Sequence, residues 1–248
     1  PFGNAQVTFE ITNPLIQQYY QAHPEMLCCI TGFIGSNEKD QTTTLGRGGS
    51  DYTASIIGAA LQSEEIQIWT DVDGFMTADP RMVKKAFTLP EISYTEAMEL
   101  SYFGAKVIYP PTMIPVFQKK IPITIRNTFN PGFTGTVIKD EVHRNGSLIR
   151  GISSINEISL LNVQGSGMVG KTGFSGKLFS LLAKENINII LITQASSEHS
   201  ITLAITPKDA ERARRLIENE FELELLTQKI DRPELEHGLS ILAVVGEN

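Results

Sequence analysis

Residues 42–51 (TTTLGRGGSD) have the residue types and spacing best suited to chemistry in this chain. The glycines of this stretch have no Cβ, so the backbone can adopt positive φ and its N–H groups can approach an anionic ligand closely. A helix is expected to begin near Ser50, a plausible N-cap, and its N-terminus would add partial positive charge. Arg47 adds a planar donor fork suited to a carboxylate or a phosphate. The stretch therefore predicts an anion-binding turn.

A glycine-rich turn can also be an ordinary surface loop. The spacing is not that of a P-loop, because no GK[ST] follows, and it is not the GxGxxG fingerprint. Three later polar clusters favour a site, since each ends an apolar segment: residues 68–74 (IWTDVDG), 77–81 (TADPR) and 103–110 (FGAKVIYP). In open α/β sheets ligands bind beyond the carboxyl ends of the strands, so residues 47–51 and 70–73 are expected to converge on one edge.

The composition excludes several classes of protein. The 248 residues suffice for one large or two ordinary domains, and the formal net charge of −7 argues against a nucleic-acid partner. No 18-residue apolar run or signal peptide is present, which predicts a cytoplasmic protein without a membrane partner. The adjacent Cys28 and Cys29 are interpreted as core thiols in a reducing compartment. No metal site is predicted, because the histidines have no ligand spacing: His23, His143, His199 and His237.

Apolar periodicity predicts the elements that must position these clusters. The first half of the chain alternates between helix and strand, which indicates an α/β fold with a mostly parallel sheet flanked by helices. The expected helices begin at Asn13-Pro14, with the proline at the first helical position, and near Ser50, and a third covers 94–103 and ends at Gly104. The expected strands are 27–34, 66–72 and 121–126, and residues 130–135 form a turn-rich exit.

The second half has a different order of elements. Strand-like runs at 148–155 and 157–163 precede a second glycine-rich stretch, QGSGMVGKTG, and a helix from Phe174. Strands at 188–194 and 200–206, a helix after Pro207 and a closing strand at 221–226 follow. From residue 157 this order is βαββαβ, which predicts a ferredoxin-like domain.

The motifs TGFIG, TTTLGRGGSDYTAS, IWTDVDG, DPR and FGAKV, in this order, resemble the C-terminal half of the catalytic domain of aspartate kinases, in the amino-acid kinase family. The run GMVGKTGFSGKLFSLLAKENINIILITQASSEHSITLAI resembles an ACT domain, a small amino-acid-sensing module. ITQASSEHS and the FELELL ending are most similar to the bifunctional aspartate kinase–homoserine dehydrogenases. The resemblance implies a kinase region at 1–140, a linker and strand of a second ACT module at 141–156, an ACT domain at 157–228, and the start of the truncated second module at 229–248.

The resemblance implies phosphoryl transfer from ATP to L-aspartate, with Mg²⁺ held mainly through the nucleotide phosphates. This is the first step of the biosynthesis of lysine, threonine and methionine. An amino-acid effector, threonine with lysine as the alternative, would regulate it, and ACT domains would pair to form a homo-oligomer. The family's N-terminal KFGG-type segment, whose lysine compensates the transferring phosphate, is not among these residues, so the chain alone is predicted to be inactive.

The resemblance places Asp51 at a catalytic position. A carboxylate substrate is already ionised at pH 7 and needs no general base, so Asp51 would orient a lysine or help to hold Mg²⁺. The alternative is an acidic residue that favours the helix dipole. Arg47 would bind the α-carboxylate of aspartate, with Gly49 and Ser50 beside it; the alternative is a solvated arginine.

The nucleotide positions implied by the family are Thr70, Asp71, Met76, Asp79, Arg81 and Lys106. Asp71 is expected on the ribose or adenine side, and Lys106 at a phosphate oxygen unless it is only a helix-end charge. Met76 stands where family members commonly have tyrosine. Methionine has no aromatic ring to stack on adenine, but its thioether can still pack against the adenine ring.

The effector positions implied by the ACT resemblance are Gly167, Met168, Gly170, Gly173, Ile192 and Gln194. The loop before the helix suits an amino-acid carboxylate, and the Gln194 amide would contact threonine, although Gln194 could simply end an edge strand. Two other hypotheses remain. One is a regulatory amino-acid-binding module with a vestigial kinase half, and the other is a kinase for glutamate, acetylglutamate or a nucleotide monophosphate.

Overall fold

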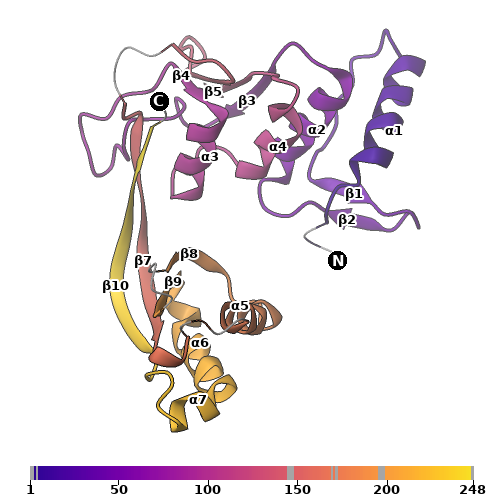
Figure 1. The fold of residues 1–248 in the computed structure, drawn as a ribbon. Coiled ribbons are helices and arrows are strands. Elements are labelled where there is room, and N and C mark those ends of the chain that lie inside the picture. The colour runs from indigo at the N-terminus through magenta and orange to yellow at the C-terminus, as the bar shows by residue number, and fades with distance from the viewer. Residues whose placement is uncertain are drawn as a thin grey trace. The chain divides into compact units, whose positions relative to one another are not determined.

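The computed structural model describes residues 3, 5–143, 148–168, 170, 173–194 and 199–246 (Figure 1). The chain divides into two compact units, Pro1–Ser154 with Leu242–Asn248, and Ile155–Ile241. Among the described residues, no helix has the length and apolar character needed to cross a membrane.

The first unit has a four-stranded sheet in the order β3-β5-β6-β4, plus a two-stranded antiparallel ribbon of β1 and β2. In the sheet β3 pairs with β5 and β4 with β6 in parallel, whereas β5 and β6 are antiparallel. The predicted α/β class is therefore confirmed. The helices are α1 (Phe9–Ala22), α2 (Gly49–Leu61), α3 (Tyr94–Tyr102) and α4 (Ile114–Phe117), with a 3-10 turn at Pro110–Met113. The strands are β1 (Ile34–Ser36), β2 (Thr42–Thr44), β3 (Ile66–Thr70), β4 (Glu91–Ser93), β5 (Ile123–Asn127) and β6 (Thr136–Lys139).

One face of this sheet forms the core of the unit. Isoleucines alternate along β3 and β5, and the parallel register sets Ile66 beside Ile123 and Ile68 beside Ile125. Helices α2, α3 and α4 and their flanking turns contribute apolar side chains to the same cluster. Burial of each such side chain stabilises the fold by about 1.5–3 kcal/mol. The sheet therefore holds the ends of β3 and β5, where the polar clusters follow, in a fixed register.

Helix α3 has clear signals at both ends. Ser93 Oγ accepts from the Glu96 backbone N–H at 3.1 Å, and Glu96 Oε2 accepts from the Ser93 N–H at 3.0 Å, which forms a capping box. Gly104 follows the helix with a φ of 118°, so the predicted terminal glycine is confirmed. The Tyr94 hydroxyl donates to Ile121 O at 2.5 Å, and burial raises its pKa to about 12.

The predicted buried strand at 27–34 is wrong. The backbone is irregular up to Ile34, and the side chains of Leu27 and Ile30 are 99% and 51% exposed. Only β1, at the end of the segment, finds a partner strand among the described residues, and a strand needs one for its backbone hydrogen bonds. The interpretation of the cysteines as core thiols is wrong as well, because Cys29 is exposed and Cys28 only partly buried.

Two helix starts also differ from the prediction. Helix α1 begins at Phe9, so Pro14 lies inside it and not at its first position. Gly48, not Ser50, is the N-cap of α2, because the chain enters this helix with a positive φ of 74° that glycine adopts without strain. Strands β4 and β6 are only three and four residues long and are not predicted from the sequence.

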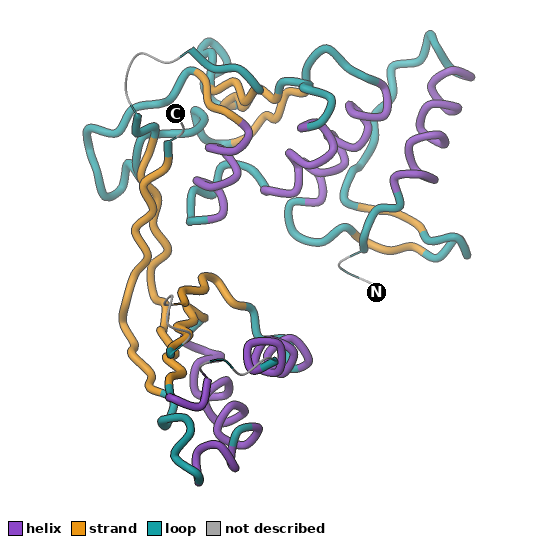
Figure 2. Tube along the Cα trace, in the orientation of Figure 1, coloured by secondary structure: helices purple, strands orange, loops and turns teal. Residues whose placement is uncertain are grey.

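The second unit contains a four-stranded sheet in the order β10-β7-β9-β8, and β9 is antiparallel to both of its neighbours. The long strands β7 and β10 run side by side (Figure 2). Leu178 and Leu182 of α5 and Ala213 and Ile217 of α6 pack into one core with the sheet. The elements are β7 (Gly151–Gln164), a 3-10 turn (Ser166–Met168), α5 (Phe174–Lys184), β8 (Ile189–Gln194), β9 (Ser200–Ile205), α6 (Pro207–Glu220), α7 (Glu222–Leu226) and β10 (Glu234–Val245).

The ferredoxin-like order is present, but two strand predictions are wrong. The runs at 148–155 and 157–163 belong largely to one strand, β7, with a positive φ of 58° at Glu157 between them. Residues 221–226 form the helix α7 and not a closing strand; the fourth strand is β10. The physical reason is packing: Phe221 is buried against Phe174, 4.6 Å between ring centroids, whereas Leu223 and Leu226 face solvent. This is the one-sided pattern of a helix.

Candidate active site and effector site

The anion turn, residues 46–49, is held by conformation and by packing. Gly46 and Gly48 have φ values of 81° and 74°, and the Gly49 N–H donates to Gly46 O at 3.0 Å. A Cβ at Gly48 would lie 2.4 Å from the Cβ of Tyr109. Position 48 therefore requires glycine both for its positive φ and for its closeness to Tyr109. The turn packs directly against the segment that follows Lys106.

Asp51 lies in the first turn of α2 and connects to the same segment. Its pKa is raised because burial disfavours the charged carboxylate, while hydrogen bonds from the Ser50 hydroxyl and from the Tyr109 backbone lower it in part. The Ser50 Oγ to Asp51 Oδ1 distance is 3.3 Å. The rings of Tyr52 and Tyr109 also meet edge to face at 6.5 Å. Asp51 is thus a partly desolvated carboxylate at a helix N-terminus, beside the turn that holds the glycines.

Arg47 and Ser50 are both exposed, and Gly49 between them is buried. Arg47 forms no ion pair with any described residue, so its guanidinium is available to a ligand carboxylate. This arrangement can present backbone N–H groups, one hydroxyl and one guanidinium to an anion.

The loops after β3 and β5 are joined by side-chain hydrogen bonds. Asp73 Oδ1 accepts from Asn127 Nδ2 at 2.8 Å and from Asn130 Nδ2 at 3.3 Å, and the Thr128 N–H donates to Thr70 O at 2.8 Å. The Thr70 hydroxyl donates to Asp71 Oδ1 at 3.2 Å, and Asp71 itself is exposed. Asp73, Asn127 and Asn130 are not among the individual site residues that the sequence predicts. Their signal in the sequence is polar side chains at the end of, or within three residues after, two neighbouring strands.

The exposed face of β3 carries Trp69. Its side chain is 47% exposed, and its indole Nε1 donates to Gln67 Oε1 at 3.2 Å. The Arg126 guanidinium lies 5.1 Å from the ring centroid, within the range of a cation–π contact. Trp69 therefore sits immediately before the two candidate nucleotide residues, Thr70 and Asp71.

The TADPR segment contains a preformed ion pair. Arg81 Nε and its NH2 group donate to the Asp79 carboxylate at 3.0 and 2.7 Å, and these hydrogen bonds lower the pKa of Asp79. The side chain of Arg81 is nevertheless 86% exposed, so Asp79 orients the guanidinium and leaves part of it open to a ligand. Met76 is partly buried and forms an antiparallel bridge with Thr88. Lys106 lies exposed in the turn after Gly104 and has no ion-pair partner in the described part of the chain.

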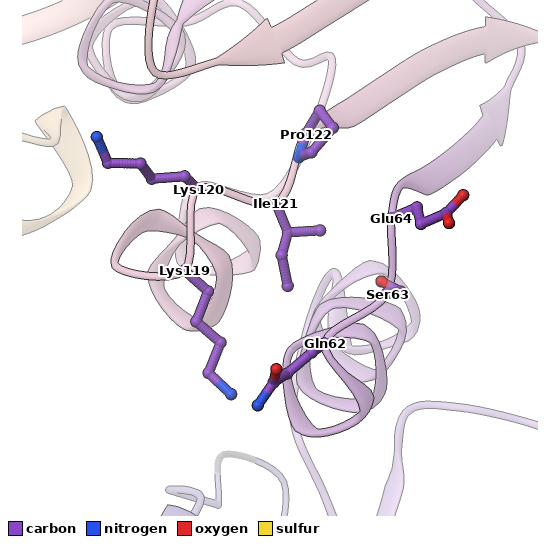
Figure 3. A pocket seen from close by; sticks show the side chains of 7 residues that line it. All are labelled: Gln62, Ser63, Glu64, Lys119, Lys120, Ile121 and Pro122. Carbon is purple, nitrogen blue, oxygen red and sulfur yellow. The ribbon is translucent and has the colours of Figure 1, made fainter.

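A pocket of about 500 Å³ lies elsewhere in this unit (Figure 3). Its lining residues directly precede β3 and β5, so it sits at the amino ends of these strands, away from the edge that carries Thr70 and Asp71. Lys119 Nζ donates to Ala59 O at 2.5 Å, and Lys120 pairs with Asp140 at 2.6 Å, so both lysines already have partners. The lining residues are Gln62, Ser63, Glu64, Lys119, Lys120, Ile121 and Pro122.

In the second unit, two glycines before α5 have positive φ. Gly173 is the N-cap of α5 with a φ of 96°, Gly170 has a φ of 64°, and the first turn of α5 carries no acidic residue. Gly167 is packed instead, since its N–H donates to Lys229 O at 2.7 Å, and Met168 is buried. Residues 169, 171 and 172, within the predicted loop, lie outside the described residues.

Ile192 and Gln194 are both exposed on β8, two residues apart and therefore on one face. Strand β8 ends the described sheet, so the edge-strand interpretation of Gln194 fits its place while an effector contact stays a prediction. In the described ranges, no group of three or more His, Cys, Asp or Glu side chains could hold a metal ion.

Comparison with known proteins identifies the class of the chain. Residues 2–127 match the amino acid kinase family, and residues 161–221 match an ACT domain. The chain belongs to the amino acid kinase family and continues into an ACT domain. The predicted sequence of the two folds is thus confirmed, while the domain boundaries and the roles of single site residues stay predictions.

Aspartokinases are among the individual relatives. The chain is 44% identical over 218 residues to the bifunctional aspartokinase/homoserine dehydrogenase of Haemophilus influenzae, covering 88% of this chain and 27% of that protein. The structure of E. coli aspartokinase III in complex with aspartate and ADP matches with a TM-score of 0.79 and 34% identity, covering 99% of this chain and 54% of that one. The same enzyme in complex with lysine and aspartate gives a TM-score of 0.75 at 34% identity, covering 98% and 54%. The chain therefore spans only part of the length of its relatives.

Proposed function

We propose that this chain is part of an aspartate kinase, which phosphorylates the side-chain carboxylate of L-aspartate with ATP to give 4-phospho-L-aspartate. The observation that carries the proposal is the match of 99% of the chain to a protein solved with aspartate and ADP. The bifunctional relative favours a polypeptide that also contains homoserine dehydrogenase.

The substrate side of the site is assigned to the anion turn. Arg47 binds the α-carboxylate of aspartate, and the backbone around Gly49 and the Ser50 hydroxyl add donors at the N-terminus of α2. The attacking carboxylate is ionised at pH 7, so no residue has to remove a proton from it. Asp51 therefore acts on the position of neighbouring cations and not as a base.

The nucleotide side is assigned to the carboxyl ends of β3 and β5 and to the two following segments. Thr70, Asp71 and Met76 lie on the ribose and adenine side, whereas Arg81, oriented by Asp79, and the exposed Lys106 provide positive charge for the phosphates. Mg²⁺ carried by the phosphates would neutralise developing charge, as in other phosphoryl transfers.

Regulation is assigned to the ACT domain. An amino-acid effector, threonine with lysine as the alternative, binds with its carboxylate at the glycine loop before α5 and its polar groups near Gln194. Pairing of ACT domains between copies of the protein would complete this site.

The activity is tested with the complete polypeptide, ATP, aspartate and hydroxylamine, which traps aspartyl phosphate as the hydroxamate. We expect product with aspartate but not with glutamate, acetylglutamate or a nucleotide monophosphate. Arg47→Ala should lower kcat/KM for aspartate by about 10²–10³, the range for loss of one preorganised donor. Arg215→Ala removes an equally exposed arginine from α6 and should leave this value unchanged. Absence of product with the intact protein would refute the proposal.

The effector is tested by calorimetric unfolding with threonine, then lysine, then Mg-ATP. A ligand that binds only the folded state stabilises it by RT ln(1 + [L]/Kd), about 2.7 kcal/mol at a hundredfold excess over Kd. A shift with threonine alone supports threonine regulation, and a shift with lysine alone replaces it by lysine. If an amino acid binds but Asp51→Ala leaves the kinase activity unchanged, the chain is an amino-acid-sensing module with a vestigial kinase half.

A further inference from the structure

The first residues of β7 contact both elements that carry nucleotide candidates. The Ile152 N–H donates to Thr77 O at 2.8 Å, inside the loop of residues 76–81. Gly151 lies so close to α3 that an added Cβ would be 3.3 Å from the δ carbons of Leu100. Residues 150–152, called here the β7 start, therefore touch the nucleotide loop on one side and, on the other, the helix that leads to Lys106.

A buried ion pair fixes the β7 start to the same helix. Glu96 of α3 is 1% exposed, and its Oε1 accepts no hydrogen bond from the described residues. Arg150 Nε lies 3.7 Å from this oxygen, and the side chain of Arg150 is only 13% exposed. A buried carboxylate without a compensating charge is strongly unfavourable, so Arg150 is the group that makes this position tolerable.

Arg150 is itself held in place from two further directions. Its NH2 group donates to His143 O at 2.8 Å, and its backbone N–H donates to Val245 O at 2.8 Å. Its side chain and backbone thus have separate partners. Any displacement of the β7 start must break several of these contacts together.

The capping of α3 does not require this arginine. Glu96 uses its other oxygen, Oε2, to accept from the Ser93 N–H, and this contact alone completes the capping box. The ion pair of Lys120 and Asp140 in the same unit is much more exposed, with side chains 67% and 37% accessible against 13% and 1% for Arg150 and Glu96. The Glu96–Arg150 pair is therefore an addition that links the helix to β7.

We propose that Arg150 is a positioning residue: by pairing with Glu96 it fixes the β7 start, which in turn holds residues 76–81 and the segment around Lys106 in their nucleotide-binding arrangement. The inference rests on the proposed function for the identity of the ligand. The same strand, β7, continues past Glu157, where φ is positive, into the sheet of the second unit.

The first experiment compares Arg150→Gln with wild type by amide hydrogen exchange, which requires no ligand and no activity. We expect faster exchange of the amides in residues 76–81 and 103–109. Lys120→Gln is the matched control, since it also removes one lysine or arginine from an ion pair of the same unit, and it should leave both segments unchanged. If Arg150→Gln lowers only the unfolding temperature and leaves exchange in both segments as in wild type, the proposal is overturned.

The second experiment measures binding of Mg-ADP by calorimetry at a temperature where every variant is folded. Arg150→Gln should weaken binding by about 5- to 150-fold, the usual range of coupling between sites. Gly151→Ala leaves the ion pair intact but inserts a methyl group against Leu100, and it should weaken binding in the same direction. Unchanged affinity in both variants would contradict the positioning role. If wild type itself does not bind Mg-ADP, the proposed nucleotide site fails, while the exchange comparison still decides the role of Arg150.

Discussion

The two glycine-rich turns of this chain look alike in sequence but differ in structure. Each places a glycine with positive φ at the N-cap of a helix, Gly48 before α2 and Gly173 before α5. A Cβ at Gly48 would collide with Tyr109 at 2.4 Å, whereas a Cβ at Gly173 would have no atom of the described residues within 4 Å. The same local chemistry thus gives a glycine packed against a tyrosine in the kinase unit and, as far as the described residues show, a glycine without such packing in the ACT unit.

The first turns of the two helices also differ in charge. Asp51 lies in the first turn of α2, while α5 has no acidic residue there. Asp51 already compensates part of the positive charge at the N-terminus of α2, so binding of an anion at this turn depends on Arg47 as well. The N-terminus of α5 lacks such a carboxylate, which suits it to a ligand that brings its own.

The largest expected effect is that of Gly48→Ala. The left-handed backbone costs a residue with a Cβ about 1–2 kcal/mol, and forced packing against Tyr109 adds about 1–3 kcal/mol. We therefore expect the free energy of unfolding to fall by about 2–5 kcal/mol, measured by urea denaturation followed by circular dichroism. If this variant loses no more stability than the corresponding variant of Gly173, the packing difference between the turns is refuted.

Gly173→Ala provides that corresponding variant. Only the backbone cost applies, so we expect a loss of about 1–2 kcal/mol by the same measurement. Gly176→Ala is its control, because Gly176 is the third residue of α5, its φ is not positive, and a Cβ there would have no atom of the described residues within 4 Å. Alanine is the better helix former there and should add up to about 1 kcal/mol. A Gly173→Ala variant as unstable as Gly48→Ala would mean that the ACT turn is packed as well.

Asp73→Ala tests whether side-chain contacts also hold the loops of the kinase unit. The substitution removes the acceptor shared by Asn127 and Asn130, and we expect a loss of about 1 kcal/mol together with faster amide exchange at residues 127–130. Asp231→Ala, at an exposed position of the second unit, should change neither quantity. Unchanged exchange at 127–130 would show that the backbone bond from Thr128 to Thr70 suffices.

The smallest expected effect is a change in the unfolding temperature on replacing Asp51, and it depends on pH. Because burial raises its pKa in the folded state, the favourable contribution of Asp51 is present below the unfolded pKa of about 3.9 and lost as pH rises through the folded value. At pH 7 Asp51→Asn should therefore unfold at a slightly higher temperature than wild type, although kinase activity falls. The gain should shrink as pH drops toward 4. A gain that is absent at pH 7 or independent of pH would contradict this account.

Local chemistry in the sequence predicted much of this structure. The glycines of residues 46–49 indicated positive φ, and both Gly46 and Gly48 have it. The apolar alternation of β3 and β5 and the periodicity of α2, α3, α5 and α6 indicated the correct elements. Such signals are local, because they depend on residues within a few positions of each other along the chain.

The errors arose where a distant partner decides the outcome. Residues 27–34 have strand-forming side chains, but among the described residues only the end of the segment finds a strand to pair with. Phe221 is an apolar residue that favours strands, yet its ring packs on Phe174 and residues 222–226 form the helix α7. Likewise, no pattern in the sequence indicates that Tyr109 packs against Gly48 or that Arg150 forms an ion pair with Glu96.

The chain has a single tryptophan, Trp69, half exposed beneath Arg126 and directly before Thr70 and Asp71. The tryptophan fluorescence of these 248 residues therefore originates in the kinase unit, at the edge where a nucleotide is expected. An emission change on adding a ligand would report this edge without any label. A ligand confined to the ACT domain could alter that emission only by changing the environment of one indole in the other unit.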